Sequence, residues 1–168
     1  PSGRAGAFFA DAGWVTDGNA DVAIPTPDTV WQVSGEPTLT PDSPVTLTWE
    51  NGAGLTFERT ISVDENYMFT VEQRVTNAGE ASVSLFPYAR VQRQGRPETS
   101  GFFILHEGPI GVFGEEGLKQ PSYGSLEDDE VIRPGRSESG WLGVTDKYWA
   151  ATVIPEPGTA FEPRFLFT

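Results

Sequence analysis

A regular alternation of apolar and polar side chains between Val45 and Val91 most constrains the fold of this chain. Such a period of two is typical of strands with one buried face. The turn signals Asn51-Gly52 and Asp64-Glu65-Asn66 interrupt it. We therefore expect an antiparallel meander with strands at 45–49, 55–63 and 67–76, continued by a fourth strand at 83–91. Pro87 inside the fourth strand predicts an edge position or a bulge.

The rest of the chain also favours strands over helices. Residues 1–44 are rich in proline, which predicts an irregular crossing segment with short edge strands at 29–33 and 36–39. Short strands are expected at 102–105 and 110–113, and a closing strand at 165–168. The acidic run at 127–130 is expected to be a solvated loop. No stretch of useful length has the helical period, so the sequence predicts an all-β sandwich or barrel with little helix.

The segment Gly140–Pro155, GWLGVTDKYWAATVIP, holds two of the five tryptophans. Thr145-Asp146-Lys147 reads as a turn inside it. Residues 148–154 are largely apolar on both side-chain parities, which is typical of a strand covered on both faces. We expect these residues to form the central strand.

Length, charge and cysteine content narrow the possible functions. A chain of 168 residues fits a single domain over 1–168. The net charge of −13 argues against nucleic acid and anionic membrane surfaces as partners. With no cysteine, disulfides and thiolate metal sites are excluded. The chain begins without Met and stops on the apolar Phe165–Thr168, so we expect a fragment truncated at both ends.

No catalytic, cofactor or metal site can be assigned from the residues. His106 is the single histidine and has no partner at the spacing of a triad or a zinc site, so it is interpreted as a turn or interface residue. A pair of carboxylates could serve a glycosidase or an epimerase, but with 24 acidic residues that signal has no specificity. The acidic run lacks the alternating pattern of a calcium loop. The chain is therefore interpreted as a non-enzyme.

Aromatic side chains give the one weak sign of a binding surface. They could line a groove for an apolar peptide, a lipid or a sugar, or they could be core, since aromatic residues carry much of the buried area of a sandwich. The residues in question are Phe86, Tyr88, Trp141 and Trp149.

The segment 140–155 resembles the pattern GGW-x-G-x-x-D-x-Y-(W/F)-A-x-x-x-IP of the YidC membrane protein insertase family, in its large first periplasmic domain. The hairpin 55–79, LTFERTISVDENYMFTVEQRVTNAG, and the stretch 95–114, GRPETSGFFILHEGPIGVFG, are similar to the same domain in its alphaproteobacterial form. The resemblance covers roughly residues 14–155.

This resemblance implies a β-supersandwich of two antiparallel sheets, similar to galactose-mutarotase-like domains but without their catalytic pair. It also implies a non-catalytic domain at the periplasmic face of the bacterial inner membrane, which assists the insertion and folding of membrane proteins. In that role it would be a scaffold or contact surface for the Sec translocon or for substrate. The alternative from the residues is a carbohydrate- or peptide-binding module with an aromatic groove. The sequence leaves the partner, the contact face and the oligomeric state open.

Overall fold

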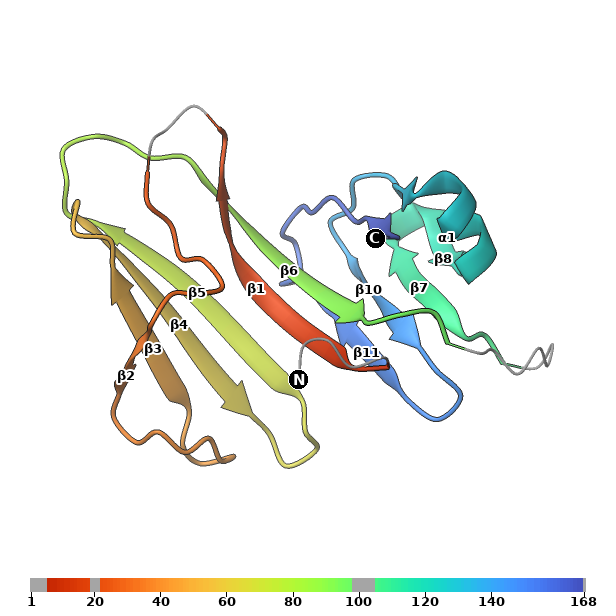
Figure 1. Cartoon of the computed structure of the whole chain (residues 1–168), viewed down its shortest axis with the longest axis horizontal. Helices are drawn as coiled ribbons and strands as arrows, with labels where there is room; N and C mark the ends of the chain where they lie inside the picture. Colours follow the sequence, from red (N-terminus) through yellow and green to blue (C-terminus); the bar gives the residue numbers. More distant parts are fainter. Residues whose placement is uncertain (1–5, 19–21, 98–104, 168) are drawn as a thin grey trace. The chain divides into compact units, whose positions relative to one another are not determined.

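The computed structural model describes residues 6–18, 22–97 and 105–167, and the chain divides into two compact units. Unit 2 is Ala12–Tyr88, and unit 1 comprises Pro1–Asp11 and Ala89–Thr168. The chain passes from one unit to the other within strand β1 (Phe8–Thr16) and again within β6 (Leu85–Arg93) (Figure 1).

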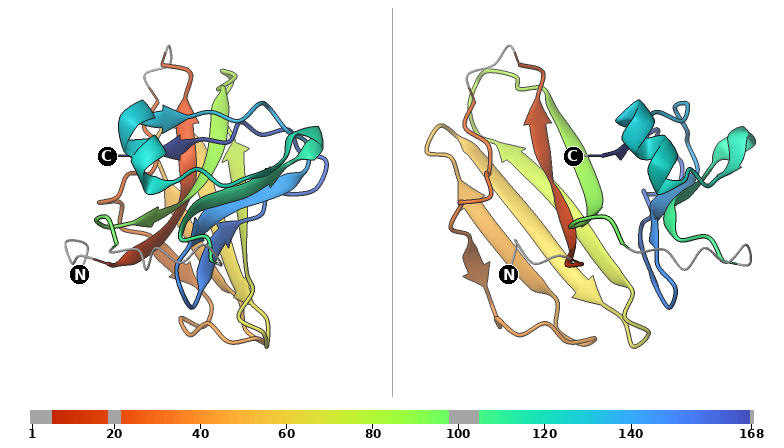
Figure 2. Two further views of the ribbon diagram at one scale, coloured as in Figure 1. Left: turned by 90° about the vertical axis from the view of Figure 1, so that its right-hand side faces the viewer. Right: turned by 45° about the vertical axis from the view of Figure 1, so that its right-hand side comes forward.

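Unit 2 is built on a four-stranded antiparallel sheet in the order β2-β3-β4-β5. Its strands are β2 (Gln32–Ser34), β3 (Val45–Glu50), β4 (Leu55–Val63) and β5 (Phe69–Asn77) (Figure 2). In its register Trp49 lies opposite Phe57, and Phe57 lies opposite Val75. The predicted meander is confirmed over β3, β4 and β5. The edge strand expected at 29–33 exists as β2, shifted along the chain, whereas 36–39 is not a strand.

The core of unit 2 forms where one end of this sheet is covered. Trp14, Leu55 and Phe57 are buried together, and the Phe57 ring lies 5.1 Å from that of Trp14 and 5.6 Å from that of Trp49, measured between centroids. The half-buried apolar side chains packed against them are Val22, Ile24, Trp31, Trp49, Val75, Val83 and Leu85. Burial of such aromatic rings supplies most of the hydrophobic stabilisation available to a small unit.

The fourth strand does not continue the meander. β6 pairs with β1 in a two-stranded sheet, instead of with β5. Alternation identifies a strand but not its partner, which explains this error. The segment FFADAGWVT of β1 was also predicted to be irregular, because alanine, glycine and aspartate dilute its pattern. Pro87 meets the edge expectation, since β6 has β1 as its single partner among the described strands.

Unit 1 contains a second four-stranded antiparallel sheet, in the order β11-β10-β7-β8. Its strands are β7 (Gly108–Phe113), β8 (Gly117–Lys119), β10 (Gly140–Thr145) and β11 (Ala150–Val153). The strand expected at 110–113 is thus confirmed. The turn between β10 and β11 is confirmed as well, closed by the Asp146 N–H donating to the Trp149 carbonyl at 2.8 Å.

The prediction that residues 148–154 form the central strand is wrong. β11 lies at the edge of its sheet, and Tyr148, Trp149 and Ile154 are exposed. The inner strands are β7 and β10. Their glycines interrupt the run of apolar side chains that is expected of a strand covered on both faces. Gly140 shows why they are needed: its φ is +123°, and a Cβ there would overlap the Val112 carbonyl oxygen.

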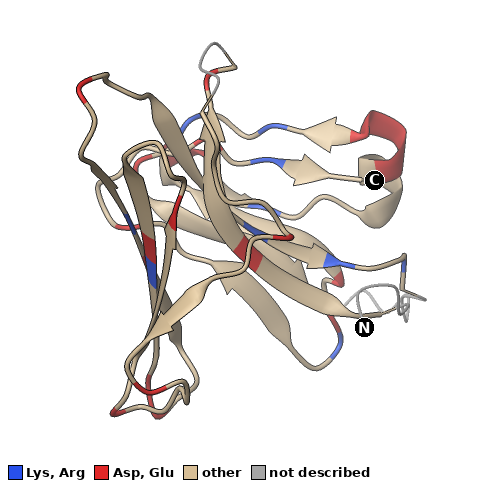
Figure 3. Ribbon diagram, turned by 60° about the vertical axis from the view of Figure 1, so that its left-hand side comes forward, with Lys and Arg blue, Asp and Glu red and all other residues tan. Residues whose placement is uncertain are grey.

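The remaining elements of unit 1 surround a separate core. They are the 3₁₀ turn η1 (Gly114–Glu116), the helix α1 (Tyr123–Asp129), β9 (Val131–Ile132) and β12 (Phe165–Leu166), which pairs with β9. Phe113, Leu126 and Phe165 are buried against one another. The acidic run is therefore partly helical (Figure 3). The prediction of a loop there is wrong, although its C-terminal acids are exposed.

The all-β prediction is confirmed, since the described strands form antiparallel sheets and α1 has seven residues. Of the strand expected at 102–105, residues 102–104 lie outside the described residues, and Leu105 is in a bend. The closing strand is confirmed in shortened form as β12.

Candidate functional site

The four aromatic candidates belong to different units. Phe86 and Tyr88 are on β6 in unit 2, and the Tyr88 ring packs on the backbone of Gly13. Trp141 and Trp149 belong to unit 1, where the Trp149 ring lies 4.4 Å from that of Phe8. Phe86 and Trp149 are each 54% exposed. An aromatic groove made by these residues stays a prediction.

Unit 1 contains a partly open cavity of about 260 Å³ that none of the four aromatic candidates lines. Its walls come from the end of β6, from β7, β10 and β11, from α1 and from β12. Most of the lining is apolar, and includes Val91, Pro109, Leu126, Leu142, Val144, Val153, Phe165, Leu166 and Phe167. Sites for small molecules have this general make-up, apolar walls with a few polar groups, although their volumes are usually about 300–1,000 Å³.

The charged side chains in the described lining of this cavity are all arginines. Four arginines line it, and no aspartate or glutamate does so among the described residues: the arginines are Arg90, Arg93, Arg96 and Arg164. Such a concentration stands out in a chain with 24 acidic and 11 basic residues. Each guanidinium has an acidic neighbour outside the lining, at Asp11, Asp146, Glu127 and Glu162.

Arg93 is the most enclosed of the four, with 13% of its side chain exposed. Its guanidinium lies 5.6 Å from the centre of the Phe8 ring, and its Nη2 is 3.7 Å from the Asp146 carboxylate, too far for a good hydrogen bond. Its buried Nε has no hydrogen-bond partner among the described residues. A buried donor without a partner loses the free energy of its hydration, of the order of 1–3 kcal/mol. Arg93 therefore has donor capacity to spare at the cavity.

Tyr123, the first residue of α1, places a second such group at the same cavity. Its hydroxyl is buried and has no hydrogen-bond partner in the described part of the chain. Burial raises the pKa of Tyr123 above its usual value of 10.0; Arg93 acts in the opposite direction, whereas Asp146 and Glu107 raise it further. The hydroxyl therefore stays protonated at neutral pH and can donate a hydrogen bond.

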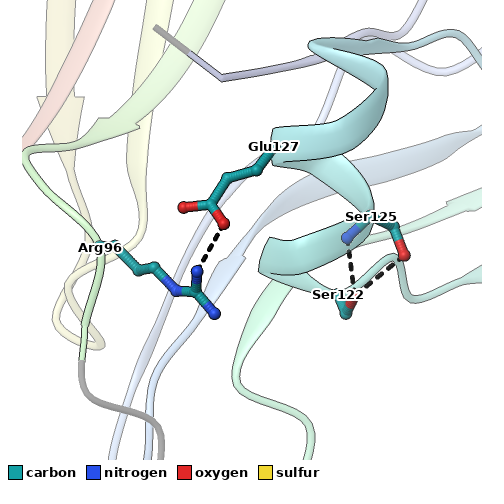
Figure 4. A network of polar contacts seen from close by, with 4 residues as sticks. All are labelled: Arg96, Ser122, Ser125 and Glu127. Carbon is teal, nitrogen blue, oxygen red and sulfur yellow. Dashed lines mark hydrogen bonds and ion pairs between the residues drawn. The ribbon is translucent and has the colours of Figure 1, made fainter.

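Arg96 and Glu127 connect the chain after β6 to the helix that carries Tyr123 (Figure 4). The guanidinium and the carboxylate point toward each other and form an ion pair. At the start of α1 the Ser122 hydroxyl caps the helix by accepting from the Ser125 N–H at 3.0 Å. These contacts fix the position of Tyr123 against the cavity.

Unit 2 presents an apolar surface at the far end of its sheet from the buried core. Ile61 lies opposite Val71, and Val63 lies opposite Phe69, on the same sheet face as the core residue Phe57. We call the exposed side chains of this hairpin, Tyr67, Met68, Phe69 and Val71, the hairpin patch. Their exposed fractions are 83%, 54%, 58% and 44%.

The turn of this hairpin holds an aromatic residue in an unusual conformation. Tyr67 has a φ of +62° although it is not glycine. The Asp64 side chain accepts from the N–H groups of Asn66 at 2.8 Å and Met68 at 2.9 Å, which fixes the turn. Left-handed backbone at a bulky residue costs of the order of 1–3 kcal/mol, so a strained and exposed tyrosine suggests a contact role.

Sequence reasoning missed Arg59, Arg93 and Tyr123. Arg59 lies between Trp14 and Trp31, with its guanidinium carbon 5.9 and 5.1 Å from the ring centres, and donates to the Ala12 carbonyl oxygen. Arg59 is two residues after Phe57 in the alternating pattern, so the sequence already placed its side chain on the same sheet face as Leu55 and Phe57. No comparable signal exists for Arg93 and Tyr123, because tertiary packing alone brings them to one cavity.

His106, the histidine considered for catalysis, makes contacts that belong to the turn before β7. The His106 ring lies at the start of β7, with its Nε2 2.7 Å from the Pro109 carbonyl oxygen, and its own carbonyl accepts from the Thr145 hydroxyl. Within residues 6–18, 22–97 and 105–167, no three histidine, aspartate or glutamate side chains are grouped to hold a metal ion. No helix in the described part of the chain has the length and hydrophobicity that a membrane span requires.

Comparisons with known proteins agree with one another. The family model described as the YidC periplasmic domain matches residues 1–167. A relative in Mesorhizobium japonicum, named membrane protein insertase YidC, is 50% identical over 160 residues, which are 95% of this chain and 26% of the relative. Proteins of the same name in Sinorhizobium medicae and Beijerinckia indica are 47% and 46% identical over 98% of this chain, and 28% and 27% of their own length is covered.

The chain thus spans about a quarter of the length of these curated relatives. The family match extends across both units, from the start of the sequence to the closing strand. On these findings the chain belongs to the YidC periplasmic domain family.

Proposed function

We propose that this domain is a non-catalytic contact module of a membrane protein insertase, at the periplasmic face of the bacterial inner membrane. In this role it assists the insertion and folding of membrane proteins by binding Sec translocon components or emerging substrate. The family description and the names of the relatives support the setting. The hairpin patch is the observation that supports the contact role.

The patch suits a contact surface because its apolar area is continuous. The paired residues Ile61 and Val71, and Val63 and Phe69, put four apolar side chains next to one another on one sheet face. Contiguous exposed apolar area of this kind usually marks an interaction site. The neighbouring hairpin tip adds Tyr67 and Met68, and tyrosine and methionine are both enriched in protein interfaces.

The experiment uses a chimera, because the relatives are longer than this chain. The corresponding domain of the Mesorhizobium japonicum insertase is replaced by this sequence, which is 50% identical to it. A photo-crosslinking amino acid at position 67 is expected to capture a translocon subunit or a nascent membrane protein. The matched control is position 148, an equally exposed tyrosine in unit 1.

A double substitution in the patch completes the test. Phe69→Ser with Val71→Ser is expected to abolish the crosslink from position 67 and to slow insertion, while the abundance of the chimera stays unchanged. Normal insertion with no crosslink in the unsubstituted chimera would contradict the contact role. Complete loss of insertion on deleting the domain, despite normal folding and abundance, would contradict a role limited to assistance.

A further inference from the structure

The cavity of unit 1 holds two hydrogen-bond donors that the protein does not use. They are the Arg93 Nε and the Tyr123 hydroxyl, both buried and both without a partner among the described residues. We propose that this cavity binds a single-chain anionic amphiphile of the fatty-acid class, with its carboxylate at Arg93 and Tyr123. Its alkyl chain lies against Leu126, Leu142 and Phe165.

The two donors without a partner select a ligand group that accepts hydrogen bonds, and an anion accepts them most strongly. Among the described residues, four guanidinium groups and no carboxylate line the cavity, and each guanidinium has a carboxylate neighbour outside the lining. A carboxylate oxygen accepts hydrogen bonds without donating any, so it can take both the Arg93 Nε–H and the Tyr123 O–H. Hydrogen bonds to a charged group are stronger than those between neutral groups. A neutral alcohol would gain much less, and an ammonium group, which has only donors, could accept from neither.

The remainder of the lining selects an alkyl chain over a peptide. Leu126, Leu142 and Phe165 offer carbon surface and no polar side-chain atoms. A peptide segment would bring amide groups against these walls, and each buried amide without a partner costs free energy. A methylene chain has no such cost and gains about 0.8 kcal/mol for each buried CH₂ group. The volume of about 260 Å³ suits one short chain.

Asp146 provides an internal check on this arrangement. Its carboxylate lies 3.7 Å from the Arg93 Nη2, so it competes with a bound anion for the same guanidinium. Its Oδ1 also accepts from the Lys147 N–H at 2.7 Å, a bond that an asparagine can keep. Asp146→Asn is therefore expected to strengthen anion binding while preserving the turn between β10 and β11.

The first measurement is calorimetric titration of the 168-residue chain with octanoate, after a cooperative thermal unfolding transition has shown that the sample is folded. Octan-1-ol and octylammonium have the same chain with a neutral or positive head, and acetate has the head without the chain. Octanoate is expected to bind at least tenfold more tightly than all three. Octyl phosphate, as a fourth probe, distinguishes a fatty-acid site from one for phospholipid head groups, which would prefer the phosphate.

Variants then test the two donors. Tyr123→Phe removes only the unpartnered hydroxyl and is expected to weaken octanoate binding about tenfold, equivalent to about 1.4 kcal/mol. Arg93→Gln is expected to remove the preference for octanoate over octan-1-ol. Tyr148→Phe and Arg136→Gln are the matched controls, since both change exposed side chains of unit 1 outside the cavity lining, and neither should alter binding.

Three results would overturn the proposal. One is equal binding of octanoate, octan-1-ol and octylammonium, which would show a merely apolar cavity. Another is the absence of detectable octanoate binding at roughly 10 millimolar, in a sample that unfolds cooperatively. The third is unchanged octanoate affinity in both Tyr123→Phe and Asp146→Asn, because a site centred on Arg93 requires these two variants to change it in opposite directions.

Discussion

Phe57 and Phe69 provide a sharp test of how unit 2 is stabilised. Both lie on the same face of the β4–β5 hairpin, where Phe57 is opposite Val75 and Phe69 is opposite Val63. Phe57 is fully buried, whereas Phe69 is 58% exposed. The two residues therefore have the same type and the same sheet face, and they differ in tertiary cover. Replacing each by alanine measures the contribution of that cover.

The expected costs follow from this burial. Phe57→Ala leaves a cavity between the rings of Trp14 and Trp49 and should lower the free energy of unfolding by about 3–5 kcal/mol. Phe69 already has more than half of its surface in water, and burial of a whole phenylalanine contributes about 1.5–3 kcal/mol. Phe69→Ala should therefore cost about 1 kcal/mol.

Urea unfolding followed by tryptophan fluorescence measures both values, because Trp14 and Trp49 report on the Phe57 site. A domain of this size is stable by about 5–15 kcal/mol, so Phe57→Ala can remove a large part of the total. Phe57→Leu, with a smaller loss of volume, keeps the comparison measurable if the alanine variant unfolds. Equal costs for the two alanine variants would refute the assignment of the core.

Three further predictions concern unit 1. Gly140→Ala should lower the free energy of unfolding, measured by thermal unfolding, by about 3 kcal/mol or more, because the new Cβ would meet the Val112 carbonyl oxygen. The matched control is Gly158→Ala, where φ is +81° and the space around the residue is open, and it should cost about 1–2 kcal/mol. Tyr123→Phe should leave the ligand-free protein as stable as the parent or up to about 1 kcal/mol more stable, since it removes a buried hydroxyl without a partner. A loss of more than 1 kcal/mol would mean that the hydroxyl has a partner. Because the pKa of Tyr123 is raised in the folded protein, the unfolded chain releases the tyrosine proton at a lower pH than the folded chain does. The stability of the parent should therefore fall as the pH rises above 10, and the stability of Tyr123→Phe should fall less.

The alternation of side chains determined the strands of unit 2 and the all-β class of the chain. β3, β4 and β5 follow it closely, because a strand with one buried face repeats every two residues whatever packs on that face. The same pattern could not name the partner of β6, since either edge of a sheet satisfies an alternating strand. The motif at 140–155 identified the family correctly, although its second half lies at a sheet edge.

Tertiary structure alone decided the candidate site. Arg93 and Tyr123 are 30 positions apart and carry no shared pattern, yet β6 and α1 bring them to one cavity. It also decided that Phe57 is core and Phe69 is surface, although the sequence assigns both to one face. The physical reason is common to both cases. Period and propensity are local properties of the chain, whereas burial and the convergence of side chains depend on which distant segments cover a given face.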